Sequence, residues 1–536
     1  MAVQECPQSA LLLTSVMAAI LGSLQVGYHT GNINAPAKII EEFFNQTWRD
    51  RYNETMSEQS LTLLWSLSVS IKDFGALLGC LGVKYVADSF GRRNSILIVN
   101  CLSVVGTGLM VVSKVSESFE TLILGRLLFG LFCGLVMSLN PLYIQEVSPT
   151  VLRGAFATLN QVAYASGILL GMVSGLETIL GTEELWSIML SLSLIPALAQ
   201  YLILPFCPES PRYLLINKGQ EAKADAALLR LRGSPGGVSA ELEEMKGEAA
   251  RTQAAVGVLE FFQKRSYRQP IIIVLCVSMG SQLSGFNAII NYSTRMFQAN
   301  FEEAKYLTLG VGAINVVFTL VAVSPRCHIV AVATSAPESF SHVCTFLSFH
   351  LQFFLMEKAG RRRLLLIGFV SIAVSNLLLT VVDLVVSTVP ELASLQVLLA
   401  FCLVSAYEFG PGPISWFIAG ELFDQPGRSI AMAYASILNW GGKFLLALLF
   451  PPILVSLQST SSWTHFLSYL PLSRSFSLFV FFLHAESHRR LLLPPLHGHG
   501  SDGLHLYLVS SSRDQGPHVR RDRGGVPGVG KPPVAE

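Results

Sequence analysis

Ser281–Asn291 reads SQLSGFNAIIN and lies within an apolar run that extends from Ile271 to about Phe297. Such a run is long enough to cross a bilayer. Polar side chains are costly in hydrocarbon, so those of this stretch should face a bundle interior or a water-filled cavity. Amides donate and accept hydrogen bonds, which suits an uncharged ligand rich in hydroxyl groups. Gly285 would let the helix bend there. The alternative is that these side chains only join helices: Ser281, Gln282, Ser284, Asn287 and Asn291.

Composition points to a polytopic membrane protein. The 536 residues are 51% hydrophobic and 14% charged, which is too apolar for a soluble globular protein. The formal net charge is only +1, so the chain lacks the large positive charge that is typical of nucleic-acid-binding proteins. The nine cysteines have no metal or redox spacing, and no nucleophile–base pair or phosphate loop is evident. We therefore predict no enzyme activity, no metal site and no cofactor.

Apolar runs of spanning length divide the chain into two halves. Six runs lie at 10–30, 61–83, 94–113, 121–143, 154–176 and 186–206. Five more lie at 270–298, 306–322, 363–385, 394–420 and 429–454. We predict an N-terminal six-helix half at 10–206, a helical linker at 207–268 and a C-terminal half at 269–454. The first run is interpreted as a membrane span and not as a cleaved signal peptide.

Positive charges predict the orientation of the chain. Arg92, Arg153 and Arg361–Arg363 follow even-numbered runs, which places those ends and the linker in the cytoplasm. Both termini are then cytoplasmic, and the loop after the first run faces outside. This loop holds two glycosylation sequons, at Asn45 and Asn53.

The two halves repeat a charged pattern. DSFGRR at Asp88–Arg93 matches EKAGRR at Glu357–Arg362, and an acid precedes an arginine by seven residues at Glu146 and again at Glu421. Repeated halves are typical of transporters that rock about a midplane site. We predict a cytoplasmic ionic latch between helices, although the arginines could serve topology alone. Its members are Asp88, Arg92, Arg93, Glu146, Arg153, Glu357, Arg361, Arg362, Glu421 and Arg428.

Several motifs, in this order, resemble the class I facilitative glucose transporters, which are sugar porters of the major facilitator superfamily. They are GSLQVGYHTGNINAP at Gly22–Pro36, DSFGRRNS at Asp88–Ser95, EVSPTVLRGAFATLNQ at Glu146–Gln161, PFCPESPRYLLIN at Pro205–Asn217, QLSGFNAIINYST at Gln282–Thr294, EKAGRRRLL at Glu357–Leu365 and EFGPGPISWFIAGELF at Glu408–Phe423. The resemblance extends from about residue 10 to about residue 454.

The resemblance implies an all-α major facilitator fold of twelve helices, with two six-helix halves and a cytoplasmic linker. It implies passive, alternating-access transport of a hexose, glucose or possibly fructose, across the plasma membrane. The partners are then the hexose and the lipid bilayer; the oligomeric state is not predicted. It also implies a break in the tenth helix at Gly410–Pro413. The implied sugar contacts are Gln161, Gln282, Asn287, Asn315, Glu408 and Trp416.

Some positions depart from the family pattern. Ser281 stands where most members have a glutamine, and Lys443 stands where they have a sugar-contacting asparagine. Lys72 and Asp73 put adjacent opposite charges into the second run. An unpaired lysine in hydrocarbon is costly, so Lys443 could hinder binding. These changes affect the expected substrate range more than the fold.

Two blocks interrupt the pattern. Residues 323–352 contain prolines, histidines and charges, and are not expected to form a lipid-facing helix. Their ends, Val-Ser and Leu-Gln, can be encoded by splice-site sequences, so we interpret the block as a retained intron. After Leu454 the twelfth span and the PETKG motif are missing, and we interpret 455–536 as an intron followed by a frameshift. A genuine divergent tail is the alternative.

Three functional hypotheses follow. The first is a facilitative hexose uniporter. The second is a proton-coupled sugar symporter, disfavoured because no Asp or Glu lies between Glu5 and Glu41, although Asp73 is a remote candidate for coupling. The third is a folded member that does not transport, which Lys443 and the missing twelfth span would favour.

Overall fold

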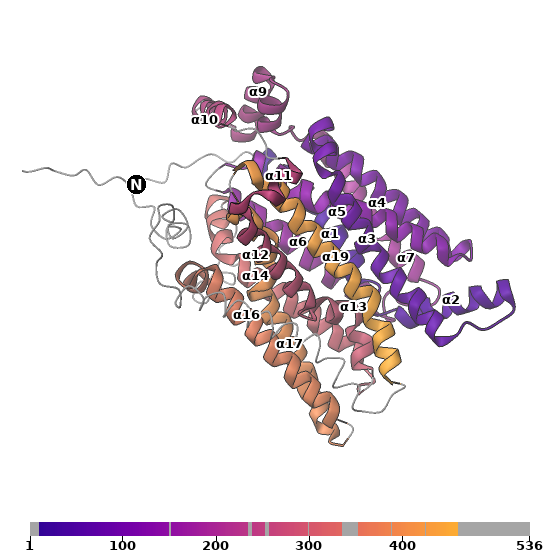
Figure 1. Ribbon diagram of the computed structural model, residues 1–536. Helices are drawn as coiled ribbons and strands as arrows, with labels where there is room; N and C mark the ends of the chain where they lie inside the picture. The colour runs from indigo at the N-terminus through magenta and orange to yellow at the C-terminus, as the bar shows by residue number, and fades with distance from the viewer. Residues whose placement is uncertain are drawn as a thin grey trace, which may run out of the picture. The chain divides into compact units, whose positions relative to one another are not determined.

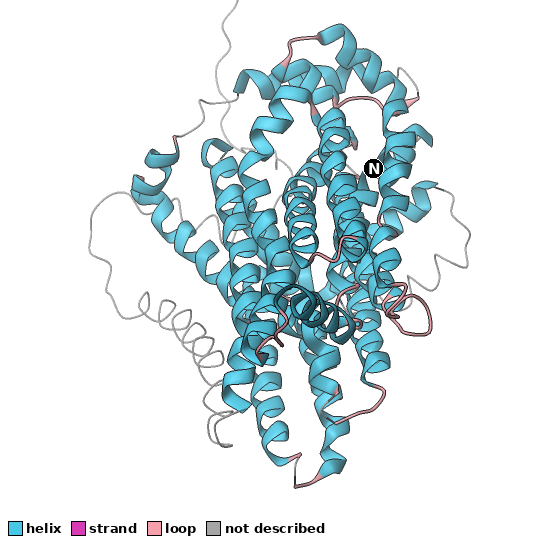
Figure 2. Ribbon diagram, turned by 90° about the vertical axis from the view of Figure 1, so that its right-hand side faces the viewer, coloured by secondary structure: helices cyan, strands magenta, loops and turns pink. Residues whose placement is uncertain are grey.

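The computed structural model describes residues 10–149, 152–233, 238–251, 257–298, 300–334, 352–386, 388–423 and 425–458. These residues form helices and their connections, with no strand among them (Figure 2). Nine helical stretches in this part of the chain are long and apolar enough to cross a membrane. The predicted class, an all-α polytopic membrane protein, is therefore confirmed.

Every predicted apolar run is helical. The first six correspond to α1 (Ala10–Gly31), α3 (Glu58–Phe90), α4 (Arg92–Val115), α5 (Phe119–Val147), α6 (Arg153–Ser174) and the pair α7 (Trp186–Ser191) and α8 (Leu194–Ile203). The later runs correspond to α12 (Arg268–Leu283) with α13 (Phe286–Phe297), α14 (Ala304–Thr334), α16 (Gln352–Val385), α17 (Ala393–Phe409) with α18 (Pro411–Leu422), and α19 (Gln425–Gln458).

Short helices form the linker and the connections. The linker contains α9 (Glu221–Arg232), α10 (Val238–Arg251) and α11 (Val258–Gln263). Single turns lie at η1 (Leu204–Phe206), η2 (Tyr213–Asn217), η3 (Arg265–Tyr267) and η4 (Pro390–Leu392). In Figure 1, α9 and α10 lie at one end of the bundle, here called the linker end, and α2 (Ala37–Tyr52) lies at the other.

The two halves meet along two pairs of helices. Within the first half, α3 packs against α5 and α1 packs against α6. Between the halves, α19 packs against α3, and α14 packs against α6. Segments more than a hundred residues apart in the chain therefore line a common interior, which is where the polar side chains of the spans are buried.

Helix α2 lies within the loop that carries both sequons. Ile40 and Phe44 are buried on one face of this helix, which explains why a short polar segment is helical. Asn53 follows it in the left-handed conformation and is exposed. Asn45 lies inside the helix and is half-buried, with Thr47 of its sequon buried. The two sequons therefore differ in accessibility.

Helix α14 extends beyond the predicted end of its run. It continues to Thr334, so the first twelve residues of the block at 323–352 are helical. The apolar sequence Ile329–Ala333 can continue such a helix. Residues 335–351 lie outside the described part of the chain, as do 459–536 of the predicted aberrant tail.

Two of the spans are broken at the predicted glycines. Gly285 separates α12 from α13 with φ +87°, a left-handed conformation that side chains with a Cβ rarely adopt. Gly410 separates α17 from α18, immediately before Pro411, Gly412 and Pro413. Both breaks lie next to predicted sugar contacts: Gly285 lies between Gln282 and Asn287, and Gly410 follows Glu408 by two residues.

Replacement of Gly285 by alanine should destabilise the protein by about 1 kcal/mol, because an L-residue at φ +87° is strained. A Cβ there would lie 3.5 Å from the Asn376 side chain, so the cost is conformational and not steric. Thermal unfolding in detergent measures it. Gly247→Ala, in open space on α10, is the matched control and should leave Tm unchanged or raise it. Equal Tm values for Gly285→Ala and wild type would contradict the prediction.

Candidate functional site

Three amide side chains form a hydrogen-bonded chain at the break between α12 and α13. The Gln282 amide nitrogen donates to Asn439 Oδ1 over 2.8 Å, and the Asn287 amide nitrogen donates to Gln282 Oε1 over 2.7 Å. All three residues are buried. We call Gln282, Asn287 and Asn439 the amide cluster. It joins α12, α13 and α19, and presents both donors and acceptors in the bundle interior.

A buried carboxylate lies between α17 and α14. Asn315 Nδ2 donates to Glu408 Oε1 over 2.9 Å, and Thr319 Oγ1 donates to Oε2 over 3.4 Å. Glu408 is 3% exposed. The side-chain amide oxygen of Asn315, Oδ1, is buried and has no hydrogen-bond partner within the described residues. That oxygen is an acceptor available to a ligand hydroxyl.

Aromatic rings lie beside these polar groups. Trp416 of α18 and Trp440 of α19 meet edge to face, with ring centroids 5.8 Å apart. The Lys443 ammonium lies 5.5 Å from the Trp416 centroid and 4.8 Å from that of Trp440. Such rings can stack against the apolar face of a sugar. The indole nitrogen of Trp440 is a further buried donor without a partner among the described residues.

The predicted contacts are brought together in pairs. Gln282 bonds to Asn287, and Asn315 bonds to Glu408. Gln161 is half-buried on α6 and is not hydrogen-bonded to these residues in the described part of the chain. Sequence reasoning missed Asn439 and Thr319, although each is a polar residue inside an apolar run, the same signal that singled out Gln282.

Polar contacts join the two halves at the end opposite the linker. Asn34 Nδ2 donates to the Ile290 carbonyl over 2.8 Å and to Ser293 Oγ over 2.9 Å. Glu41 pairs with Arg295 over 3.4 Å, and Glu177 pairs with Lys305. Burial raises the pKa of the Glu41 carboxyl, which the positive charge of Arg295 partly offsets. These contacts hold the first half against α13 and α14.

The charged motif of the first half forms a cluster at the linker end. Arg92 Nε lies 2.9 Å from Glu146 Oε2, and Arg92 Nη1 lies 3.7 Å from Asp88 Oδ1. Arg93 Nη1 donates to the carbonyl oxygens of Pro205 and Cys207. These contacts lie within the first half and its linker. They join α3, α4 and α5 to the start of the linker.

Glu209, which sequence reasoning missed, caps the start of α4. Its carboxylate accepts hydrogen bonds from the backbone N–H groups of Arg92 at 2.9 Å, Arg93 at 3.0 Å and Asn94 at 3.4 Å. Gly91 has φ +90°, and a Cβ there would lie 2.6 Å from Glu209 Oε2. The glycine of the GRR motif is therefore needed for both the turn and the approach of the carboxylate.

The structure describes the exposure of four further predicted latch residues. Arg153 is half-buried at the start of α6, and Arg362, Glu421 and Arg428 are exposed. The side chains of Glu357 and Arg361 lie outside the description. Of the ten predicted members, the structure joins Asp88, Arg92 and Glu146 by ion pairs.

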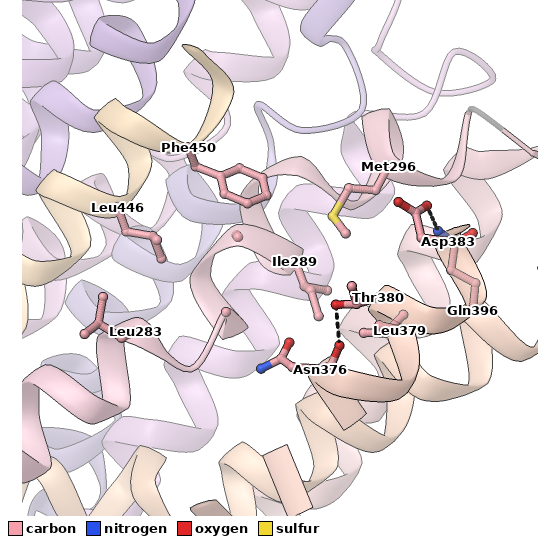
Figure 3. A pocket seen from close by; sticks show the side chains of 12 residues that line it. Leu283, Ile289, Met296, Asn376, Leu379, Thr380, Asp383, Gln396, Leu446 and Phe450 are labelled. Atoms are coloured by element: carbon pink, nitrogen blue, oxygen red, sulfur yellow. Dashed lines mark hydrogen bonds between the residues drawn. The ribbon is translucent and has the colours of Figure 1, made fainter. Parts of the chain in front are cut away.

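A separate cavity of about 70 Å³ lies inside the second half, beside Gly285 (Figure 3). Apolar side chains such as Leu283, Ile289 and Phe450 line most of it, with Asn376 and Gln396 at one side. None of the predicted sugar contacts is among its lining residues. No group of three potential metal ligands occurs among the described residues.

Comparison with known proteins decides the family. The sequence profile described as "Sugar (and other) transporter" matches residues 14–327 and 339–492. The chain belongs to the sugar transporter family. The match resumes inside the block at 323–352 and continues beyond Leu454, where motif reasoning had ended the resemblance.

Relatives of this sugar transporter include human "Solute carrier family 2, facilitated glucose transporter member 3", which is 45% identical over 443 residues, covering 82% of this chain and 83% of the human protein. The chicken protein of the same name is 44% identical over 446 residues, covering 83% of each chain. In fold, the chain is similar to the E. coli xylose transporter XylE in a partially occluded inward-open conformation, with TM-score 0.67, 21% identity, and coverage of 91% of this chain and 100% of XylE.

Replacement of Glu209 by glutamine should destabilise this sugar transporter by about 1 to 2 kcal/mol, because a charged cap at a helix N-terminus becomes neutral. The change should lower Tm in detergent. Glu244→Gln, on the exposed face of α10, removes a comparable charge without such contacts and is the matched control. A loss of Tm equal in the two variants would show that the cap has no special role.

Proposed function

We propose that the protein is a facilitative hexose transporter that works by alternating access. The amide cluster carries the proposal, because it supplies paired donors and acceptors at a helix break inside the bundle. Membership of the sugar transporter family and the names of its relatives support a sugar as the ligand. No step requires a cofactor.

In the proposed mechanism, the sugar binds between the halves. Gln282, Asn287, Asn315 and Glu408 exchange hydrogen bonds among themselves for hydrogen bonds to hydroxyl groups, and Trp416 faces the sugar ring. Gln161 approaches from the first half. Because most of these bonds are already made within the site, sugar binding is largely an exchange of polar partners, and the unpaired Asn315 Oδ1 gains one.

Closure at one end supports alternating access. The polar contacts of Asn34, and the pairs Glu41–Arg295 and Glu177–Lys305, hold the halves together opposite the linker. A carrier closed at that end would release sugar at the linker end. We propose that the Arg92 cluster, already paired within the first half in this state, meets its counterpart in the second half to form the latch when the linker end closes.

A proton-coupled symporter is the second candidate. The observation in its favour is that Asp73 is 5% exposed inside α3, so that a carboxylate is buried within a membrane-spanning helix, which is where ion-coupling residues of transporters are found. Asp73 Oδ1 already lies 3.7 Å from the Lys72 ammonium, which favours a structural ion pair. Uptake that a protonophore leaves unchanged excludes the symporter. A member that does not transport is the third candidate, and an absence of uptake in every assay would favour it.

We propose the plasma membrane as the location, with the linker end and both termini in the cytoplasm. The positive charges at the linker end support this orientation. Helix α2 then faces outside. Of its two sequons, exposed Asn53 is the better candidate for glycosylation, because Asn45 is half-buried within the helix.

We also propose that residues 10–206, 207–268 and 269–454 are the functional units, and that 323–352 and 455–536 derive from unspliced and frameshifted sequence. The mature transcript should lack the codons for 323–352 and should encode a twelfth span after Leu454. Sequencing this transcript across both junctions is the measurement. A mature message that retains both blocks would contradict the proposal.

Replacement of Gln282 by alanine should lower hexose uptake at subsaturating concentration by about tenfold, because buried partners lose their hydrogen bonds. Uptake of radiolabelled glucose and fructose in transporter-null cells measures it, normalised to surface expression. Gln263→Ala, exposed on α11, is the matched control. Unchanged uptake by Gln282→Ala would show that the amide cluster is not the sugar site.

A further inference from the structure

Lys443 places a buried cation among aromatic rings in the bundle interior. The residue is 9% exposed, and its ammonium lies 5.8 Å, 5.5 Å and 4.8 Å from the ring centroids of Tyr164, Trp416 and Trp440. Tyr164 belongs to the first half, and the two tryptophans belong to the second. The ammonium is therefore at the interface of the halves, where the proposed function places the sugar.

The charges buried around Lys443 do not balance. Lys72, Arg126 and Lys443 are cationic and Asp73 and Glu408 are anionic, and each is at least nine-tenths buried. Asp73 pairs with Lys72, and Glu408 is held by the neutral donors Asn315 and Thr319. Neither Arg126 nor Lys443 forms an ion pair within the described residues, although Asp73 and Glu408 are close enough to attract Lys443 electrostatically, and the set carries one more positive charge than negative.

Of these two cations without an ion pair, Lys443 lies beside the proposed sugar site. Asn439 of the amide cluster precedes Lys443 by one helical turn, so the two side chains share a face of α19. The neighbouring Gly442 lies so close to the amide cluster that a Cβ there would be 2.6 Å from Gln282 Cγ. A molecule held by Gln282 and facing Trp416 would thus be within reach of the ammonium.

Aromatic rings compensate a buried ammonium only in part, since the ring quadrupole is weaker than a full negative charge. A carboxylate on the ligand would complete the compensation and form a charge-assisted hydrogen bond. A neutral hexose cannot do this, and it must instead share the Trp416 ring with the cation.

We propose that Lys443 makes this site select a hexuronate, a hexose whose terminal carbon is a carboxylate. This inference rests on the proposed function, because it assumes that the amide cluster holds the sugar ring. Lys443 binds the carboxylate, the amide cluster and Glu408 bind ring hydroxyls, and Trp416 faces the ring. Lys443 is a specificity-determining residue in this scheme.

The test compares uptake of radiolabelled glucuronate and glucose by the purified full-length protein in liposomes. Wild type should take up glucuronate in preference to glucose. Lys443→Asn and Lys443→Met should shift the ratio of the two rates toward glucose by at least about tenfold, because the carboxylate loses its charged partner. Lys223→Asn, which removes an exposed lysine from α9, is the matched control and should leave the ratio unchanged.

Binding provides a readout that does not need transport. Trp416 and Trp440 flank the ammonium, so their fluorescence should change when glucuronate binds to wild type and much less when it binds to Lys443→Met. Preference of wild type for glucose, with the same ratio in Lys443→Asn, would overturn the hexuronate proposal and leave hexose transport intact. Neither uptake nor binding of either sugar by any folded variant would instead overturn the proposed function.

Discussion

A polar side chain buried in a membrane bundle has to find its hydrogen-bond partner inside the protein, because hydrocarbon offers none. This constraint explains the arrangement at the centre of this transporter. Gln282 donates to Asn439 and accepts from Asn287, so three helices are joined by amides that would otherwise be costly. The same bonds hold the site in a defined geometry. In the proposed mechanism they are exchanged for hydrogen bonds to a ligand of matching chemistry. The same side chains then serve both helix packing and ligand binding.

Breaks in the helices follow from the same constraint. At Gly285 the backbone leaves the helical conformation, and the amide cluster lies on both sides of that point. At Gly410 the break separates Glu408 from Trp416. Irregular backbone is tolerated at membrane depth where it faces protein or a cavity. Both breaks thus lie in the interior, and in the proposed mechanism they are the points at which short helical segments move as the halves rock.

Charge is distributed differently at the two ends and in the middle. At the linker end, the Arg92 side chain forms an ion pair with Glu146, and the Arg92 backbone N–H donates to the carboxylate of Glu209. At the opposite end, Glu41 and Arg295 connect the halves. In the middle, Lys443 is a cation without an ion pair among the described residues, and it faces aromatic rings. Charged clusters at the ends can separate in contact with water. A charge in the middle of the bundle has to be balanced by the protein or by a ligand, so it influences which ligand binds.

Hydropathy by itself determined the fold class, because about 20 consecutive apolar residues have few alternatives to a membrane span, and motif order determined the family. The sequence also singled out Gly285 and Gly410 as breaks, since glycine and proline act through the local backbone. Pairings came only from the tertiary structure. Asn439 meets Gln282 across 157 residues, and Glu209 meets the start of α4 across 117. Such contacts depend on how helices pack side by side, and no local pattern encodes which polar residues of distant helices will face each other.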